Sequence, residues 1–60
     1  MENLIKIGLA DNFNHLRVLR SEIDKKLSTD ESLDNEIDEL WMIINSLSET
    51  RNNLIQFKKG

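Results

Sequence analysis

The 60-residue chain contains no cysteine, no proline and a single histidine, His15. Without cysteine the protein cannot form a disulfide, and one histidine cannot build a metal site by itself. Small domains usually recruit a disulfide, a metal ion or a second subunit, because a short chain buries too small a share of its surface. The composition therefore predicts no metal and no cofactor. It leaves oligomerisation, or an unusually well-packed pair of helices, as the source of stability.

Long apolar runs are also lacking. The longest is too short to span a bilayer, and the N-terminus has neither the positive region nor the apolar stretch of a signal peptide. We therefore expect a soluble, cytoplasmic protein with no membrane contact. The net charge is −3, and residues 28–60 carry seven acidic residues against three basic ones. Because a nucleic-acid-binding protein normally presents a basic surface, this acidic excess disfavours nucleic acid as a partner.

The second half of the chain has the clearest periodicity. Apolar residues recur there at alternating spacings of four and three, as at the a and d positions of a coiled coil. They are Leu33, Ile37, Leu40, Ile44, Leu47 and, after an interruption at Arg51, Leu54. Ser28 and Glu31 have the S-x-x-E spacing of a helix-capping box. Together these features predict a helix over about residues 29–57.

The first half is less regular. Leu9, Leu16 and Ile23 repeat every seven residues and give one apolar face from about residue 9. Gly8 costs about 1 kcal/mol inside a helix relative to alanine, and Asp11 could cap a helix that starts there. We predict a helix from about residue 3 to 27. The alternative is a loose arm over residues 1–10 followed by a helix from about residue 12.

The segment KKLSTDES, between the two predicted helices, contains no strong breaker, but charge favours a reversal of the chain there. Folding at Ser28–Thr29 brings basic residues of the first helix near acidic residues of the second. The basic residues are Arg17, Arg20, Lys25 and Lys26, and the acidic ones are Asp30, Glu31, Asp34 and Asp38. The same arrangement places Phe13 against Ile44. The predicted fold class is all-α, with residues 1–60 forming one antiparallel two-helix hairpin that dimerises into a four-helix bundle.

A band of five consecutive apolar residues interrupts the polar face of the second predicted helix. It reads Leu40, Trp41, Met42, Ile43 and Ile44. Because successive helical residues are about 100° apart, these side chains point to every side of the helix. One neighbouring helix covers only the side of Leu40 and Ile44, and an uncovered apolar patch commonly marks a binding surface. We predict that this band, together with Leu47, forms the dimer and partner interface.

Two occupants of the band fit the sequence. In the first, two hairpins pair through their second helices, with Trp41 and Ile43 in the dimer interface. In the second, a different protein docks on the band and Trp41 is the aromatic anchor, since such residues often dominate interface energies. The two are compatible, because Met42 could remain free after dimerisation. We predict a small non-enzymatic interaction or regulatory protein that is a homodimer and binds another protein.

Catalytic and metal chemistry finds little support in the sequence. His15 lies beside Asn12 and Asn14, on the side of the first helix expected to be solvated. Glu31, Asp34 and Asp38 are neighbours on one helix surface, but they are expected to point outward and so favour no metal site. Arg17 and Arg20 form a short basic strip, which makes a small DNA-binding regulator one alternative function.

A second alternative comes from a resemblance. The run Asp34-Asn35-Glu36-Ile37-Asp38 is similar to the Ser-Gln-Glu-Leu-Asp signature of the small two-helix aspartyl-phosphate phosphatases of the bacterial sporulation phosphorelay. The pairs Leu16-Arg17 and Leu19-Arg20 resemble the first helix of that family. The resemblance implies a helical hairpin in which Glu36 and Asp38 are the functional residues and Asn35 replaces the family's amide. This sequence has Asp34 where the signature begins with serine, and its connection between the two helices is shorter than in that family.

Overall fold

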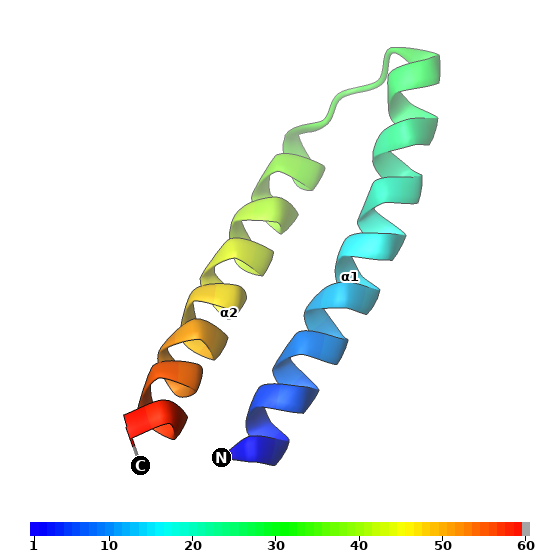
Figure 1. Ribbon diagram of the computed structural model, residues 1–60. Helices are drawn as coiled ribbons and strands as arrows, with labels where there is room; N and C mark the ends of the chain where they lie inside the picture. Colours follow the sequence, from blue (N-terminus) through cyan, green and yellow to red (C-terminus); the bar gives the residue numbers. More distant parts are fainter. Residues whose placement is uncertain (60) are drawn as a thin grey trace.

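The computed structural model describes residues 1–59, which form two long helices. Helix α1 spans Glu2–Thr29 and helix α2 spans Asp34–Lys59. They run antiparallel and side by side, so that the start of α1 lies beside the end of α2 (Figure 1). The resulting rod measures 49 × 15 × 11 Å. The predicted all-α helical hairpin is confirmed, and residues 1–59 contain no strand.

Helix α1 begins at Glu2 and therefore includes most of the segment that could have been a loose arm. Its first turn is closed by a 3.1 Å hydrogen bond from the Ile5 N–H to the Met1 carbonyl. The helix continues through Gly8 to Thr29. Over the residues described, neither helix contains a stretch long and apolar enough to cross a membrane.

The chain reverses after Thr29 rather than at Ser28–Thr29. Asp30 adopts the left-handed conformation, with φ 57°, which aspartate tolerates better than most residues. The Glu31 N–H donates to the Lys26 carbonyl and closes the end of α1. The Ser28 hydroxyl donates to the Asp24 carbonyl, four residues back. Ser28 is therefore a residue of the last turn of α1 and not the cap of the second helix.

Helix α2 begins at Asp34 rather than near residue 29. The Leu33 carbonyl accepts the N–H of Ile37 at 2.9 Å, which starts the helical ladder. The Ser32 hydroxyl accepts the N–H of Asp34 at 3.4 Å, so Ser32 takes the place that the sequence assigned to Ser28. Asp34 and Glu36 lie in the first turn, and Lys58 and Lys59 lie in the last, as the helix dipole favours.

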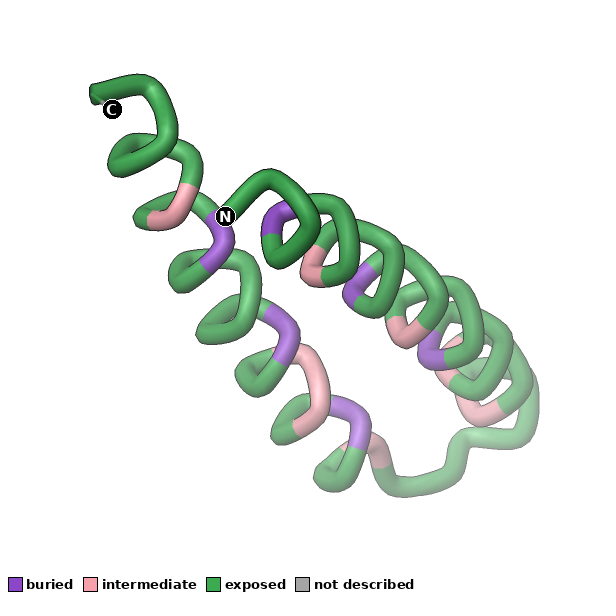
Figure 2. Tube along the Cα trace, turned by 90° about the horizontal axis from the view of Figure 1, so that it is seen from below, coloured by how far each residue is buried: buried purple, intermediate pink, exposed green. Residues whose placement is uncertain are grey.

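The contact between the helices follows one row of residues on each. The buried residues are Ile5, Asn12 and Leu19 on α1 and Glu36, Ile43 and Thr50 on α2. Each set repeats every seven residues, which is close to two helical turns, so each forms a single row along its helix. Figure 2 shows these buried segments of the two helices facing each other along the rod. These two rows are named the seam.

The sequence predicted a different contact, and that prediction is wrong. Ile44 and Phe13, expected to pack together, are 52% and 68% exposed. The observed seam is displaced by one position around α2, from Ile37 to Glu36 and from Ile44 to Ile43. A displacement of this kind is possible because the apolar stripe of α2 is wider than one neighbouring helix can cover. The stripe that was expected inside the hairpin therefore lies largely outside it.

Candidate protein-interaction surface

The residues beside the seam form a broad apolar surface on one side of the hairpin. Adjacent to the seam are two inner rows: Leu9, Leu16 and Ile23 on α1, and Leu33, Leu40, Leu47 and Leu54 on α2. Beyond them are two outer rows: Lys6, Phe13, Arg20 and Leu27 on α1, and Ile37, Ile44, Arg51 and Lys58 on α2. Within each row the residues follow one another at intervals of seven, which keeps each row on one side of its helix. The inner and outer rows together are named the apolar face.

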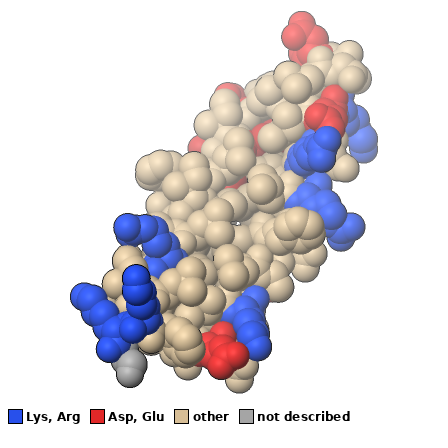
Figure 3. Space-filling view, viewed as in Figure 1, with Lys and Arg blue, Asp and Glu red and all other residues tan. Residues whose placement is uncertain are grey.

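Exposure rises from the seam outward across this face. In the inner rows Leu9, Leu16, Leu47 and Leu54 are between 38% and 47% exposed. In the outer rows Phe13, Leu27, Ile37 and Ile44 are between 52% and 68% exposed. Figure 3 views this side and shows an uncharged surface over the middle of both helices, with Lys and Arg along its margins. The hairpin thus half covers its inner rows and leaves its outer rows open.

A hollow in the surface confirms that the rows of the two helices share one side. Leu9, Phe13 and Leu16 of α1 line it together with Leu47 of α2 and the seam residue Asn12. A second hollow adjoins it and is lined by Phe13, Leu16, Arg17 and Arg20. Both hollows are flanked by Phe13, the most exposed large apolar residue of the protein. The centre of the apolar face is therefore recessed and bordered by an aromatic ring.

The structure separates the residues of the predicted apolar band. Leu40, Ile44 and Leu47 belong to the apolar face, where Leu40 is half-buried and Ile44 is exposed. Ile43 is only 3% exposed, because it is part of the seam, and so offers no surface to a partner. Trp41, 63% exposed, lies at the outer margin of α2, beyond the outer row.

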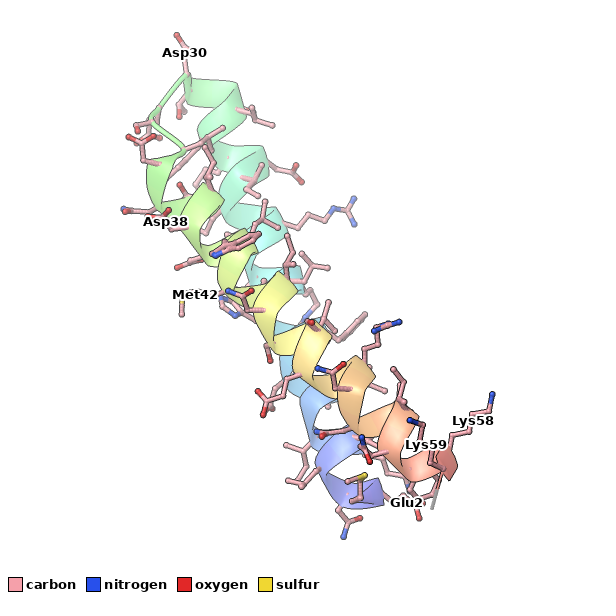
Figure 4. All side chains as sticks on the ribbon, turned by 90° about the vertical axis from the view of Figure 1, so that its left-hand side faces the viewer. Glu2, Asp30, Asp38, Met42, Lys58 and Lys59 are labelled. Carbon is pink, nitrogen blue, oxygen red and sulfur yellow. The ribbon has the colours of Figure 1, made fainter. Side chains whose placement is uncertain are left out.

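Met42 lies on the other side of α2. It is about 200° around the helix from Ile44, and Figure 4 shows it projecting to the same side of α2 as Asp38. It is 61% exposed. The band is therefore divided among the apolar face, the buried seam and the opposite surface of α2, because five consecutive side chains point to different sides of a helix.

A polar cluster occupies the seam near the open end of the hairpin. The Asn12 side-chain amide donates to the Gly8 carbonyl at 2.7 Å and to the Ser46 hydroxyl at 2.9 Å. The Thr50 hydroxyl donates to the Ser46 carbonyl at 3.2 Å. Gly8 faces Thr50 so closely that a Cβ on Gly8 would lie 2.5 Å from the Thr50 hydroxyl oxygen. The helices approach here because Gly8 has no side chain, and the hydrogen bond from Asn12 fixes their register.

An ion pair occupies the seam near the connection. The Lys26 ammonium lies 2.8 Å from one carboxylate oxygen of Glu36, and the Glu36 side chain is 9% exposed. The other oxygen, Glu36 Oε1, is buried and has no hydrogen-bond partner within residues 1–59. The hydrogen bond from Lys26 holds the pKa of Glu36 below its ordinary value, although burial opposes this. The same bond raises the pKa of Lys26.

This ion pair makes stability depend on acid. The pKa of Glu36 is lower in the folded chain than its ordinary value of 4.5. Its contribution to stability is therefore complete above pH 4.5 and is lost as the pH falls through the lower, folded-state pKa. We expect the melting temperature, followed by circular dichroism, to fall more steeply below pH 4.5 in the native protein than in Glu36→Gln. Glu49→Gln, at an exposed position, should keep the native slope, and equal slopes in all three proteins would contradict this role of Glu36.

The other charged side chains differ from the predicted pattern. Arg20 pairs with Asp24 at 4.0 Å, and Lys25 pairs with Glu22 at 3.9 Å, in both cases within α1. Lys26 is the one member of the predicted basic group for which a pair with α2 is observed in residues 1–59. The expectation that several basic residues of α1 pair across the hairpin is therefore wrong. Arg17 and Arg20 instead border the second hollow of the apolar face.

His15 lies nearer the other helix than the sequence suggested. Its Nε2 atom is 3.8 Å from a carboxylate oxygen of Glu39, and both side chains are partly exposed. Within residues 1–59 no group of three His, Asp or Glu side chains is arranged to hold a metal ion. Glu31, Asp34 and Asp38 accordingly do not converge.

The residues implied by the phosphatase resemblance are not assembled into a site. Glu36 is buried in the seam and bound to Lys26. Asn35 and Asp38 are exposed, and Asp38 lies about 200° around α2 from Glu36. The two carboxylates therefore point in nearly opposite directions, and a substrate group that reached Asp38 would not reach Glu36.

Comparison with known proteins gives no assignment: no family model, no curated protein and no solved structure matches this sequence.

The α1 half of the apolar face was missed at the sequence level. This half includes Leu9, Phe13 and Leu16. These three residues were expected inside the hairpin, because Leu9 and Leu16 belong to the seven-residue repeat of the first helix and Phe13 was expected to pack against Ile44. A signal against this was present in the adjacent row, where Gly8 and Asn12 favour a close, hydrogen-bonded contact. Small and amide side chains are suited to a helix contact that leaves the larger apolar side chains for another partner.

Proposed function

We propose that this chain is a small non-enzymatic interaction module, which pairs with a second copy through the apolar face and, as a dimer, binds another protein. The observation that carries the proposal is the open apolar face formed by both helices. Contiguous apolar surfaces of this kind are rarely left exposed by soluble proteins, and they mark sites of association. Leu40, Ile44 and Leu47 of α2 and Leu9, Phe13 and Leu16 of α1 form the proposed interface.

The small interior of the hairpin supports this proposal. Among the residues described, the buried apolar side chains are Ile5, Leu19 and Ile43. Burial of apolar side chains is the main favourable contribution to folding, and three fully buried ones form a small interior for 60 residues. Association over the apolar face supplies further burial without disulfides or metal.

The distribution of side chains over α2 also supports docking over a single face. On the opposite side α2 carries exposed polar residues at Asn35, Asp38, Asn45, Glu49 and Asn52. A helix that is largely polar on one side can bury its apolar side against a partner while the polar side stays in water. This is the arrangement of the helices within a four-helix bundle. On α1 the opposite side is mixed, because it also exposes Leu4, Ile7 and Val18.

Trp41 and Met42 are the residues that we assign to a partner protein. Trp41 points away from α1 and Met42 lies on the opposite side from Ile44, so neither is covered when a second copy occupies the apolar face. Both are more than half exposed. Aromatic side chains and methionine are enriched at protein interfaces, where a rigid indole often supplies a large part of the binding energy.

The experiment combines solution mass with partner recovery. In sedimentation equilibrium at micromolar concentration, the native chain and Trp41→Glu should both have twice the 7.0 kDa chain mass. A tagged native chain should recover a partner from its host that Trp41→Glu does not. A native mass of 7.0 kDa would contradict self-association, and equal recovery by both proteins would contradict the assignment of Trp41.

A further inference from the structure

The hairpin is electrically polar along its length. The connection end, residues 24–38, carries six acidic residues against two basic ones, a net charge of −4. The open end, residues 1–13 and 47–59, carries three acidic residues against four basic ones, a net charge of +1. Figure 3 shows Lys and Arg gathered at the lower left, where α2 ends. The two ends of one copy therefore attract the opposite ends of another.

From this polarity we infer that the occupant of the apolar face is a second copy of the chain packed in the reverse direction, with the connection end of each over the open end of the other. The inference rests on the proposed self-association and adds its geometry. Two identical faces can meet about a two-fold axis in two ways. A two-fold axis along the rod places the acidic connection ends of the two copies together. A two-fold axis across the rod places the connection end of each copy over the open end of the other.

The charges that border the apolar face also distinguish the two arrangements. At the open end the outer rows contain Lys6 on α1 and Arg51 and Lys58 on α2. Near the connection Asp34 lies just outside the outer row of α2, whereas the margin of α1 carries Arg17 and Arg20 beside Asp24. In the reversed arrangement the basic end of α2 in one copy lies over the acidic start of α2 in the other. In the parallel arrangement the basic margins of both copies meet, which is unfavourable.

The register of the seam gives the expected contacts. Asn12 bonds to Ser46, and Gly8 faces Thr50. A residue of α1 and a residue of α2 that lie level, at the same height along the rod, therefore have numbers that add to 58. The middle of the rod then lies near residue 14 of α1 and residue 44 of α2. Rotation about an axis there brings Ile44 beside its own counterpart.

The same rotation pairs charges across the dimer. Arg51 of one copy comes level with residue 37 of the other, one turn from its Asp34. On α1, Asp24 and Arg20 come level with residues 4 and 8 and so lie on either side of the other copy's Lys6, which leaves the charge preference to α2. Each pair occurs twice because of the two-fold axis. In addition α1 packs antiparallel to the second α1, and α2 to the second α2. Every neighbouring pair of helices is antiparallel in this arrangement, as it also is when like ends lie together, so the helix dipoles favour both and the charges of the two ends decide between them.

The absence of cysteine from the chain permits a direct test with single labelled positions. Ser32→Cys marks the connection end and Gln56→Cys marks the open end, and both positions are exposed and outside the apolar face. The dye pair should have a transfer range well below the 49 Å length of the rod. Donor-labelled Ser32→Cys mixed with acceptor-labelled Gln56→Cys should show loss of donor emission. Donor- and acceptor-labelled Ser32→Cys copies should show none.

The outcomes separate the arrangement from the association itself. Transfer between two Ser32→Cys copies, with a dimeric mass, overturns the reversed arrangement and leaves self-association intact. No transfer in either mixture, with the mass of a single chain, overturns the proposed function and this inference together. Transfer only in the mixture of unlike ends supports both.

Discussion

Ile44→Glu should convert the dimer into a single helical hairpin. Ile44 is at the middle of the α2 outer row and is half exposed in the hairpin, so glutamate is accommodated when the chain is alone. In the dimer the change removes burial of the exposed half of Ile44, about 1 kcal/mol per copy or about 2 kcal/mol per dimer, and it also places two carboxylates together in the interface. A loss of about 3 kcal/mol or more weakens association by more than about 100-fold. Sedimentation equilibrium over a range of concentrations measures this directly.

Asn45→Glu is the matched control for this variant. It adds the same charge one residue further along α2, on the exposed polar side, where the proposed dimer has no contact. We expect its dimer affinity to stay within about twofold of the native value, since an isolated surface charge contributes little. If Asn45→Glu weakened association as much as Ile44→Glu, net charge and not the apolar face would control assembly. If Ile44→Glu remained a dimer, the face would not be the interface.

The two helices and their antiparallel packing could be predicted from the sequence because the relevant signals are local. The stripe from Leu33 to Leu54 has helical periodicity, and the absence of proline leaves no strong break before the reversal. The residue at which the chain reverses was harder to predict, because Ser28 and Glu31 have the spacing of a capping box. The Ser28 hydroxyl instead bonds back to Asp24, and Ser32 takes over at the start of α2. Serine can satisfy backbone groups at either end of a helix, so spacing alone did not decide between them.

The side on which the helices meet could not be predicted from hydrophobicity. The most apolar rows were expected to face each other, yet the seam contains Asn12, Glu36 and Thr50. Polar groups at a contact are stable only when each finds a partner, and the partners of Asn12 and Glu36 lie on the opposite helix. Such a match depends on the three-dimensional register, so the seven-residue spacing of the seam does not by itself distinguish it from the more apolar rows beside it. The predicted interface at Leu40, Ile44 and Leu47 remains a prediction, whereas the burial of Ile43 follows from the seam.

A polar seam beside an open apolar face has a consequence for how the protein is built. The hydrogen bonds and the ion pair specify which sides of α1 and α2 meet, but a single hydrogen bond contributes only about 1 kcal/mol net. In the proposed dimer the second copy supplies further apolar burial. Stability should therefore rise with chain concentration, as it does for any folded chain that is stabilised by association. The seam sets the geometry of the hairpin, and burial of the apolar face would add to its stability.

The second large effect comes from the close approach of Gly8 to Thr50. Gly8→Ala should change the free energy of unfolding in opposite directions in the native chain and in Thr50→Ala. In the native chain a Cβ at position 8 would lie 2.5 Å from the Thr50 hydroxyl oxygen, and Thr50 is buried in the seam. Gly8→Leu should therefore force the helices apart and lower the free energy of unfolding by about 2 kcal/mol. In a Thr50→Ala background the obstructing hydroxyl and methyl groups are gone. There Gly8→Ala should raise the free energy of unfolding by about 1 kcal/mol, because alanine is the better helix former.

Urea denaturation of the four proteins of the Gly8→Ala and Thr50→Ala cycle, at one chain concentration, measures the coupling between the two positions. We expect Gly8→Ala to be destabilising with Thr50 present and stabilising without it. Thr50→Ala alone loses the hydrogen bond to the Ser46 carbonyl, and the cycle subtracts that loss. If Gly8→Ala stabilised both backgrounds equally, its Cβ would meet nothing on α2. The helices would then not be in contact at Gly8 and Thr50, and the seam would have to lie on another side of α1.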